Sequence, residues 1–166
     1  LEPHKGIMLM LDALEEFEND IELHIAGDGS LVDYISERSE LDSRIHFHGF
    51  VSLGHLMGIL HATDAVLVPS ICYENSPTVI YEAFQVGVPV IASRIGGIPE
   101  LVEEGVTGLL IEPTKQDALV NAMKQLIRDR DVWWERTDAI HKHAQTYTIK
   151  KYVNRLEELM KDINKQ

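Results

Sequence analysis

The chain has 166 residues, of which 45% are hydrophobic and 25% are charged, and its formal net charge is −12. This length and composition are typical of a single soluble globular domain. The acidic balance argues against a nucleic-acid-binding surface, which would carry a basic stripe, and against a polybasic membrane anchor.

Helical and strand patterns alternate along the chain, which is typical of a parallel α/β sheet. A first helix is predicted over 6–18, where apolar residues recur at helical spacing. Strands are expected at 21–26, 44–50, 65–69, 88–92 and 107–111. Further helices are expected after Ser30, from Ser52 to about 61, at 77–86, 99–104 and 115–129, around Trp133 and Trp134, and at 149–163. We therefore predict an α/β fold: a Rossmann-like, doubly wound parallel sheet with helices on both faces, forming a single domain over 1–166.

The chain contains one cysteine, Cys72, so it has no internal disulfide framework, and a reducing compartment such as the cytoplasm is expected. No apolar run approaches the roughly 20 residues needed to span a bilayer, and no signal peptide is visible. Because the sequence begins at Leu1 rather than at a methionine, we interpret it as a fragment.

The segment 74–82 reads Glu-Asn-Ser-Pro-Thr-Val-Ile-Tyr-Glu and carries the most functional information. Ser76 is predicted to cap a helix that begins at Pro77, and the free amides of such a helix end attract anions. Glu74 lies just outside this end, and Glu82 lies roughly 9 Å further along the axis at about 1.5 Å per residue. A diphosphate at the helix end would therefore have a carboxylate near each substituent. Carboxylates accept hydrogen bonds from paired hydroxyls, so the segment predicts a nucleoside diphosphate sugar as ligand.

Other signals in the strand-to-helix turns are weaker when taken alone. Gly27-Asp-Gly29 is a partial phosphate loop, for which a plain tight turn is an equally good interpretation. Lys5 precedes the first helix and is either a phosphate partner or an ordinary surface lysine. Gly96 and Gly97 are suited to a turn and to close backbone approach.

The eight histidines raise the question of a metal site. His46 and His48 share a strand face, and His141 and His143 are close in sequence. Neither pair is accompanied by a carboxylate or a cysteine at ligand spacing, so we expect no metal site.

Several motifs recur in a fixed order over nearly the whole chain. They are Lys5-Gly6, Ala26-Gly27-Asp28-Gly29, His48-Gly49-Phe50-Val51, Glu74-x7-Glu82, the tract 82–93, Gly96-Gly97-Ile98-Pro99-Glu100 and 105–108. In these motifs the chain resembles the C-terminal, donor-binding domain of retaining GT-B glycosyltransferases of family 4, also called glycosyl transferases group 1.

The resemblance implies a role for each matching residue. Glu82 would hold the ribose hydroxyls, and Glu74 would contact the transferred sugar as the catalytic residue, which we expect to position the sugar rather than attack it. Lys5 would neutralise phosphate charge. The remaining donor-binding positions are Gly27 and Gly29, Gly49, Phe50 and Val51 against the base, and Asn75, Ser76, Thr78 and Val79 at the diphosphate. Many relatives have Phe-Gly in place of Asn75-Ser76, and Pro77 lacks an amide hydrogen.

The resemblance also implies a reaction and its partners. Sugar would be transferred with retention of configuration, with no cofactor and no divalent metal, to an acceptor held by an N-terminal domain that this chain does not include. The isolated chain would then bind donor but turn over little. From its acidic balance we expect no contact with nucleic acid or membrane.

Two other classes stay open. One is a GT-B-fold sugar-nucleotide 2-epimerase, and the other is a non-catalytic nucleotide-sugar-binding module. A signalling receiver is disfavoured, because Asp28 and Asp64 do not assemble its acidic cluster.

Overall fold

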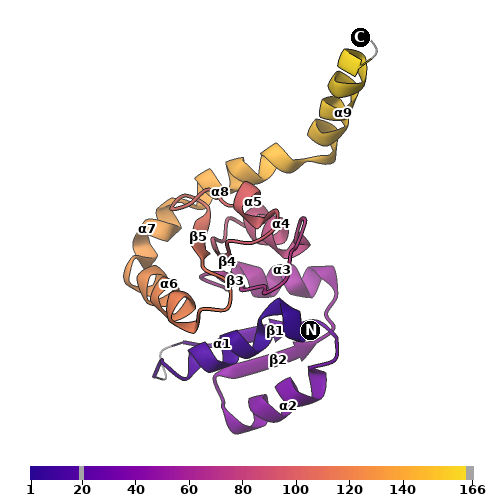
Figure 1. Cartoon of the computed structure of the whole chain (residues 1–166). Coiled ribbons are helices and arrows are strands. Elements are labelled where there is room, and N and C mark those ends of the chain that lie inside the picture. Colours follow the sequence, from indigo (N-terminus) through magenta and orange to yellow (C-terminus); the bar gives the residue numbers. More distant parts are fainter. Residues whose placement is uncertain (19–20, 164–166) are drawn as a thin grey trace.

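The computed structural model describes residues 1–18 and 21–163 (Figure 1). Their strands are β1 (Leu23–Ala26), β2 (Ile45–Gly49), β3 (Val66–Val68), β4 (Val90–Ser93) and β5 (Gly108–Ile111). Their α-helices are α1 (Ile7–Leu14), α2 (Val32–Leu41), α3 (Leu53–His61), α4 (Thr78–Gln85), α5 (Ile98–Leu101), α6 (Gln116–Arg128), α7 (Arg130–Glu135), α8 (Thr137–Ala144) and α9 (Ile149–Ile163). Two short 3-10 helices, η1 (Pro3–Lys5) and η2 (Gln145–Tyr147), precede α1 and α9.

The strands are parallel throughout, as their alternation with helices predicted. They form two ladders, β1–β2 and β3–β4–β5, and within the described residues no backbone pairing joins one ladder to the other. Side chains join them instead, because one hydrophobic cluster contains Ile25 and Ile45 from the first ladder and Ile91 and Leu109 from the second.

Helices cover both faces of the β3–β4–β5 ladder, which confirms the doubly wound architecture. Along β4, Ile91 points into the cluster formed with α1 and α6, whereas Val90 and Ala92 point into a second cluster with α3, α4, α5 and α8. This alternation is expected of a strand buried on both faces. Phe84 of α4 and Leu11 of α1 are completely buried, one in each cluster.

Local sequence explains some helix starts and misses others. Ser52 caps α3 as predicted, since its side chain accepts a hydrogen bond from the amide of His55. The predicted caps at Ser30 and Ser76 are wrong. Helix α2 starts after Leu31 and α4 after Pro77, and among the residues that the structure describes neither helix has a side-chain cap. The two serines make other bonds: Ser30 donates to the carboxylate of Glu2, and the hydroxyl of Ser76 bonds that of Tyr81.

The last helix, α9, extends away from the rest of the chain (Figure 1). It matches the predicted range 149–163, and its large apolar side chains are exposed. They are Ile149, Tyr152, Val153, Leu156, Leu159, Met160 and Ile163. Among the described residues no helix combines the length and apolarity needed to cross a bilayer.

Candidate functional site

The turns that follow the strands are tied to one another by backbone hydrogen bonds. The amide of Gly27, after β1, donates to the carbonyl of Gly49 at the end of β2 over 2.7 Å. The amide of Gly97, after β4, donates to the carbonyl of Glu74, in the turn after β3, over 2.8 Å. The carboxyl edge therefore holds the predicted ligand-binding turns in defined pairs.

Lys5 and Glu74 lie 69 positions apart in the sequence and meet at this edge. The Nζ of Lys5 donates to Oε2 of Glu74 at 2.8 Å, and the hydroxyl of Ser70 donates to Oε1. The side chain of Glu74 is only 11% exposed, whereas that of Lys5 is 44% exposed. Both oxygens of a largely buried carboxylate thus have a donor, and the ammonium group keeps access to solvent.

The surroundings of Glu74 fix its charge. Burial by itself raises the pKa of this carboxyl, but the hydrogen bonds from Lys5 and Ser70 outweigh burial and the net pKa is lowered. Glu74 is therefore ionised at neutral pH.

Glycines let neighbouring backbone approach the turn that carries Glu74. Gly96 has φ 59°, and a Cβ there would clash with the backbone of Glu74. A Cβ at Gly97 would clash with the carbonyl of Asn75, and one at Gly6, φ 77°, with the carbonyl of Pro69. These glycines allow close backbone contact inside the protein, which sets the position of Glu74 between the first helix and the turn after β4.

Helix α4 points its N-terminus at the same turn. Pro77 occupies the N-cap position with ψ 120°, so the first helical amides belong to Thr78 and Val79 and have no acceptor within the helix. Asn75, Ser76 and Thr78 are exposed. The free amides and the helix dipole make this end favourable for an anion, in the place predicted from the sequence although one residue later.

Glu82 lies on the second turn of α4 and is half-buried. Within the described part of the chain it has no hydrogen-bond or ion-pair partner, in contrast to Glu74. Its carboxylate is consequently free to accept hydrogen bonds from a ligand.

The remaining predicted positions surround the ends of β1 and β2. Gly27 and Gly29 pack against Leu1, whose carbonyl also accepts from the amide of Leu31. Gly49 has φ 61° with open space around it, and the neighbouring Phe50 side chain is 85% exposed. Val51 is half-buried. The exposed ring and open glycine form an uncovered surface next to the turn.

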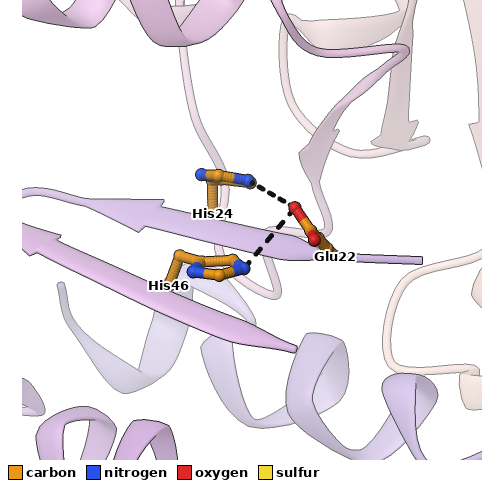
Figure 2. A group of neighbouring side chains, drawn as sticks. All are labelled: Glu22, His24 and His46. Atoms are coloured by element: carbon orange, nitrogen blue, oxygen red, sulfur yellow. Dashed lines mark ion pairs between the residues drawn. The ribbon is translucent and has the colours of Figure 1, made fainter. Parts of the chain in front are cut away.

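The structure also contains a group of side chains that the sequence reasoning did not assemble. Figure 2 shows Glu22, His24 and His46 with their polar atoms converging on one point. One oxygen of Glu22 lies 3.5 Å from Nε2 of each histidine. The expectation that His46 has no carboxylate at ligand spacing is therefore wrong. The signal was present as Glu22-Leu-His24, since side chains two apart on a strand share a face.

Comparison with known proteins gives a consistent result. The family model described as glycosyl transferases group 1 matches residues 1–147. The lipopolysaccharide 1,2-N-acetylglucosaminetransferase of Salmonella typhimurium is 29% identical over 98% of this chain and 46% of its own length. The phosphatidyl-myo-inositol mannosyltransferase of Mycobacterium leprae is 32% identical over 81% of this chain and 37% of its own length. The chain thus spans less than half the length of these relatives.

Solved structures agree with the sequence matches. The crystal structure of Anabaena HepE in complex with UDP and glucose superposes with a TM-score of 0.82 at 30% identity, over 97% of this chain and 46% of that protein. Sucrose-phosphate synthase from Thermosynechococcus elongatus superposes with a TM-score of 0.84 at 24% identity, over 98% of this chain and 43% of that protein, which supports the fold.

Proposed function

We propose a function that starts from the family, because this chain belongs to the glycosyl transferases group 1 family. It is the donor-binding domain of a retaining glycosyltransferase. It binds a nucleoside diphosphate sugar at the carboxyl edge of its strands. The observation that carries this proposal is the contact between Lys5 and Glu74 at 2.8 Å, next to the N-terminus of α4. This contact supports the proposal because it brings a cation and an anion next to free backbone amides, the groups that would hold a sugar–phosphate bond. The HepE structures with UDP, and with UDP and glucose, support this class of ligand.

The diphosphate is assigned to the start of α4. Breaking the sugar–phosphate bond leaves negative charge on the diphosphate, and donors fixed in advance around that charge lower the barrier. The amides of Thr78 and Val79 supply such donors, and Asn75 and Ser76 stand beside them. Lys5 supplies positive charge from a half-exposed side chain. In this proposal these donors stabilise the negative charge of the leaving diphosphate, and neither a divalent metal nor a cofactor takes part.

Glu74 is assigned a positioning role toward the transferred sugar. Its two oxygens are engaged by Lys5 and Ser70, and a carboxylate held by two donors is a weaker nucleophile than a free one. A held carboxylate is instead a rigid acceptor for sugar hydroxyls.

The nucleoside is assigned to the other side of the diphosphate. Glu82 has free carboxylate oxygens for the ribose hydroxyls, and the surface at Gly49, Phe50 and Val51 is open for the base. Gly27 and Gly29 would border the sugar phosphate from the turn after β1.

The acceptor and the rest of the catalytic apparatus are assigned to an N-terminal domain of the whole protein. Relatives more than twice as long as the matched region support this. The chain alone would then bind donor and transfer little sugar. We assign the chain to the cytoplasm, because this reducing compartment would keep its single cysteine reduced.

The test is calorimetric titration of the chain with UDP, GDP, ADP and CMP and with their sugar conjugates. At least one diphosphate should bind. Glu82→Gln should weaken that binding by about 1–3 kcal/mol through loss of charged hydrogen bonds. Glu100→Gln is the matched control, because Glu100 lies at the start of α5, outside the assigned site. This variant should bind donor like the parent chain.

The role of Glu74 is tested by comparing two ligands. Glu74→Gln should weaken the sugar conjugate more than the bare diphosphate. Equal weakening of both ligands would contradict the assignment to the sugar, and full retention of binding in both glutamate variants would contradict the site as a whole.

A further inference from the structure

Three histidines and one glutamate share one face of the β1–β2 ladder. His24 and His46 are directly paired across the two parallel strands, and His48 follows two positions after His46 on the same face. The opposite face of this ladder carries Leu23, Ile25, Ile45 and Phe47, which pack into the hydrophobic core. The histidines therefore lie on the face of the ladder opposite to that core cluster.

The polar atoms of Glu22, His24 and His46 converge with a spacing suited to a metal ion. Oε2 of Glu22 lies 3.5 Å from Nε2 of His24 and 3.5 Å from Nε2 of His46, and one ligand atom from each residue lies within 4.8 Å of the others (Figure 2). Tetrahedral zinc holds nitrogen and oxygen ligands at about 2.0–2.2 Å, which places neighbouring ligand atoms about 3.3 Å apart. Small side-chain adjustments would bring all three onto one ion.

One of these atoms lacks a hydrogen bond to any residue that the structure describes. Nε2 of His46 is shielded from solvent and makes no hydrogen bond within the described residues. A buried polar atom left unsatisfied is costly, and such an atom in a native fold calls for an explanation such as a bound ion or water. A metal ion at the convergence point would satisfy it.

The second nitrogen of His24 is already held as metal binding requires. Nδ1 of His24 lies 2.9 Å from Nε2 of His48. When Nδ1 carries the proton and donates to His48, Nε2 of His24 presents its lone pair toward Glu22. Histidine ligands in proteins are commonly oriented by such a hydrogen bond from the other ring nitrogen.

Ring stacking fixes how the histidines lie on this face. His24 and His46 stack with ring centroids 4.6 Å apart, and His24 and His48 with centroids 5.2 Å apart. The ring of His24 therefore contacts both of the other histidine rings on this face.

We propose that Glu22, His24 and His46 bind a divalent transition-metal ion, with Zn²⁺ as the best-matched ion, and that His48 orients His24. Two imidazoles and one carboxylate form a recognised zinc ligand set, with water in the open fourth position. The exposed side chains of Glu22 and His24 leave room for that water. The ion links β1 to β2 and so acts on the ladder, independently of donor binding at α4. This departs from the sequence expectation of no metal site.

The test is calorimetric titration of metal-free chain with Zn²⁺, with Co²⁺ absorption as a second reading of coordination geometry. One ion per chain should bind and raise the melting temperature, because an ion that binds only the folded state stabilises it. Mg²⁺, which prefers oxygen ligands, should produce neither effect.

Variants locate the site. His24→Gln and His46→Gln should each weaken Zn²⁺ binding about tenfold or more, and His48→Gln should weaken it less. His61→Gln is the matched control, because His61 lies on α3 and bonds the carbonyl of Met57, and it should bind Zn²⁺ like the parent chain. Circular dichroism of each variant separates loss of binding from loss of fold.

Three results would overturn the proposal. One is the absence of a one-to-one Zn²⁺ site in the parent chain. Another is full Zn²⁺ affinity in folded His24→Gln and His46→Gln. The third is loss of Zn²⁺ binding on Cys72→Ser or His61→Gln, which would place the ion elsewhere.

Discussion

The ion pair between Lys5 and Glu74 should couple η1, the short helix before α1, to the turn after β3 by about 1 kcal/mol at neutral pH. A hydrogen bond to a charged group contributes about 1.5–3 kcal/mol when well shielded. Glu74 is only 11% exposed, but Lys5 is 44% exposed, and solvent reduces the coupling toward the roughly 0.2–1 kcal/mol of surface pairs. Lys5→Met alone should cost more than the coupling energy, because it leaves a largely buried carboxylate with Ser70 as its remaining side-chain donor.

The coupling should depend on pH in one direction. The pKa of Glu74 is lowered in the folded state from its ordinary value of 4.5, since the donors outweigh burial. Stabilisation from a lowered carboxyl pKa is present above the unfolded value and is lost as the pH falls through the folded value. The coupling between Lys5 and Glu74 should therefore be full at neutral pH and decrease once the pH falls below 4.5.

The assay is a double-mutant cycle of Lys5→Met and Glu74→Gln, with urea unfolding followed by tryptophan fluorescence, to which the buried Trp133 contributes. The same cycle for Arg155 and Glu158, an exposed pair at 3.5 Å on α9, is the control and should give almost no coupling. A coupling no larger than this control, or one that is unchanged in acid, would refute the reasoning.

Three further substitutions, the last of them with a control variant, test backbone contacts and packing. Gly96→Ala should destabilise the fold by about 2–4 kcal/mol in urea unfolding, because the residue has φ 59° and the added Cβ would clash with the backbone of Glu74. Unchanged stability of this variant would contradict the close contact. Gly58→Ala in α3 should instead stabilise by about 0.5–1 kcal/mol, since the Cβ enters open space; a loss of stability would show that the helix is not regular there. Arg44→Met should lower the free energy of unfolding by about 2–4 kcal/mol, because the Arg44 side chain donates to carbonyls at and beyond the end of α1. The control Arg128→Met, at an exposed side chain, should lower it by less than about 0.5 kcal/mol. Equal losses of stability in the two variants would count against the role of Arg44.

Sequence periodicity was sufficient for the order and type of most elements. The alternating strands and helices follow from apolar spacing, and Ser52 caps its helix as its residue type indicates. The predicted helix starts were wrong where the expected capping side chain forms a hydrogen bond with another side chain instead. Ser76 bonds the hydroxyl of Tyr81 rather than a helix amide, and Pro77 takes the cap position with an extended ψ. Cap propensity is local, and these partners come from tertiary structure.

The candidate site was foreseen as separate residues and not as a contact. Lys5 and Glu74 were each singled out from the sequence, but their 2.8 Å ion pair depends on how the first helix meets the turn after β3. The group of Glu22, His24 and His46 was missed for a related reason. Its geometry depends on the register that pairs His24 with His46, and register between strands is set by side-chain packing and hydrogen bonding across the sheet, not by residue spacing within one strand.

The separation of the five described strands into two ladders has a consequence for the motions of the fold. In the part of the chain that the structure describes, β4 is hydrogen-bonded to a strand on both sides, whereas β1 and β3 each have a ladder partner on one side only. Side-chain packing between the ladders resists their separation, but it does not protect amide protons from exchange as backbone hydrogen bonds do. Amide protons of β4 should consequently exchange with deuterium most slowly, and the β1–β2 unit should open at a lower free energy than the three-stranded unit.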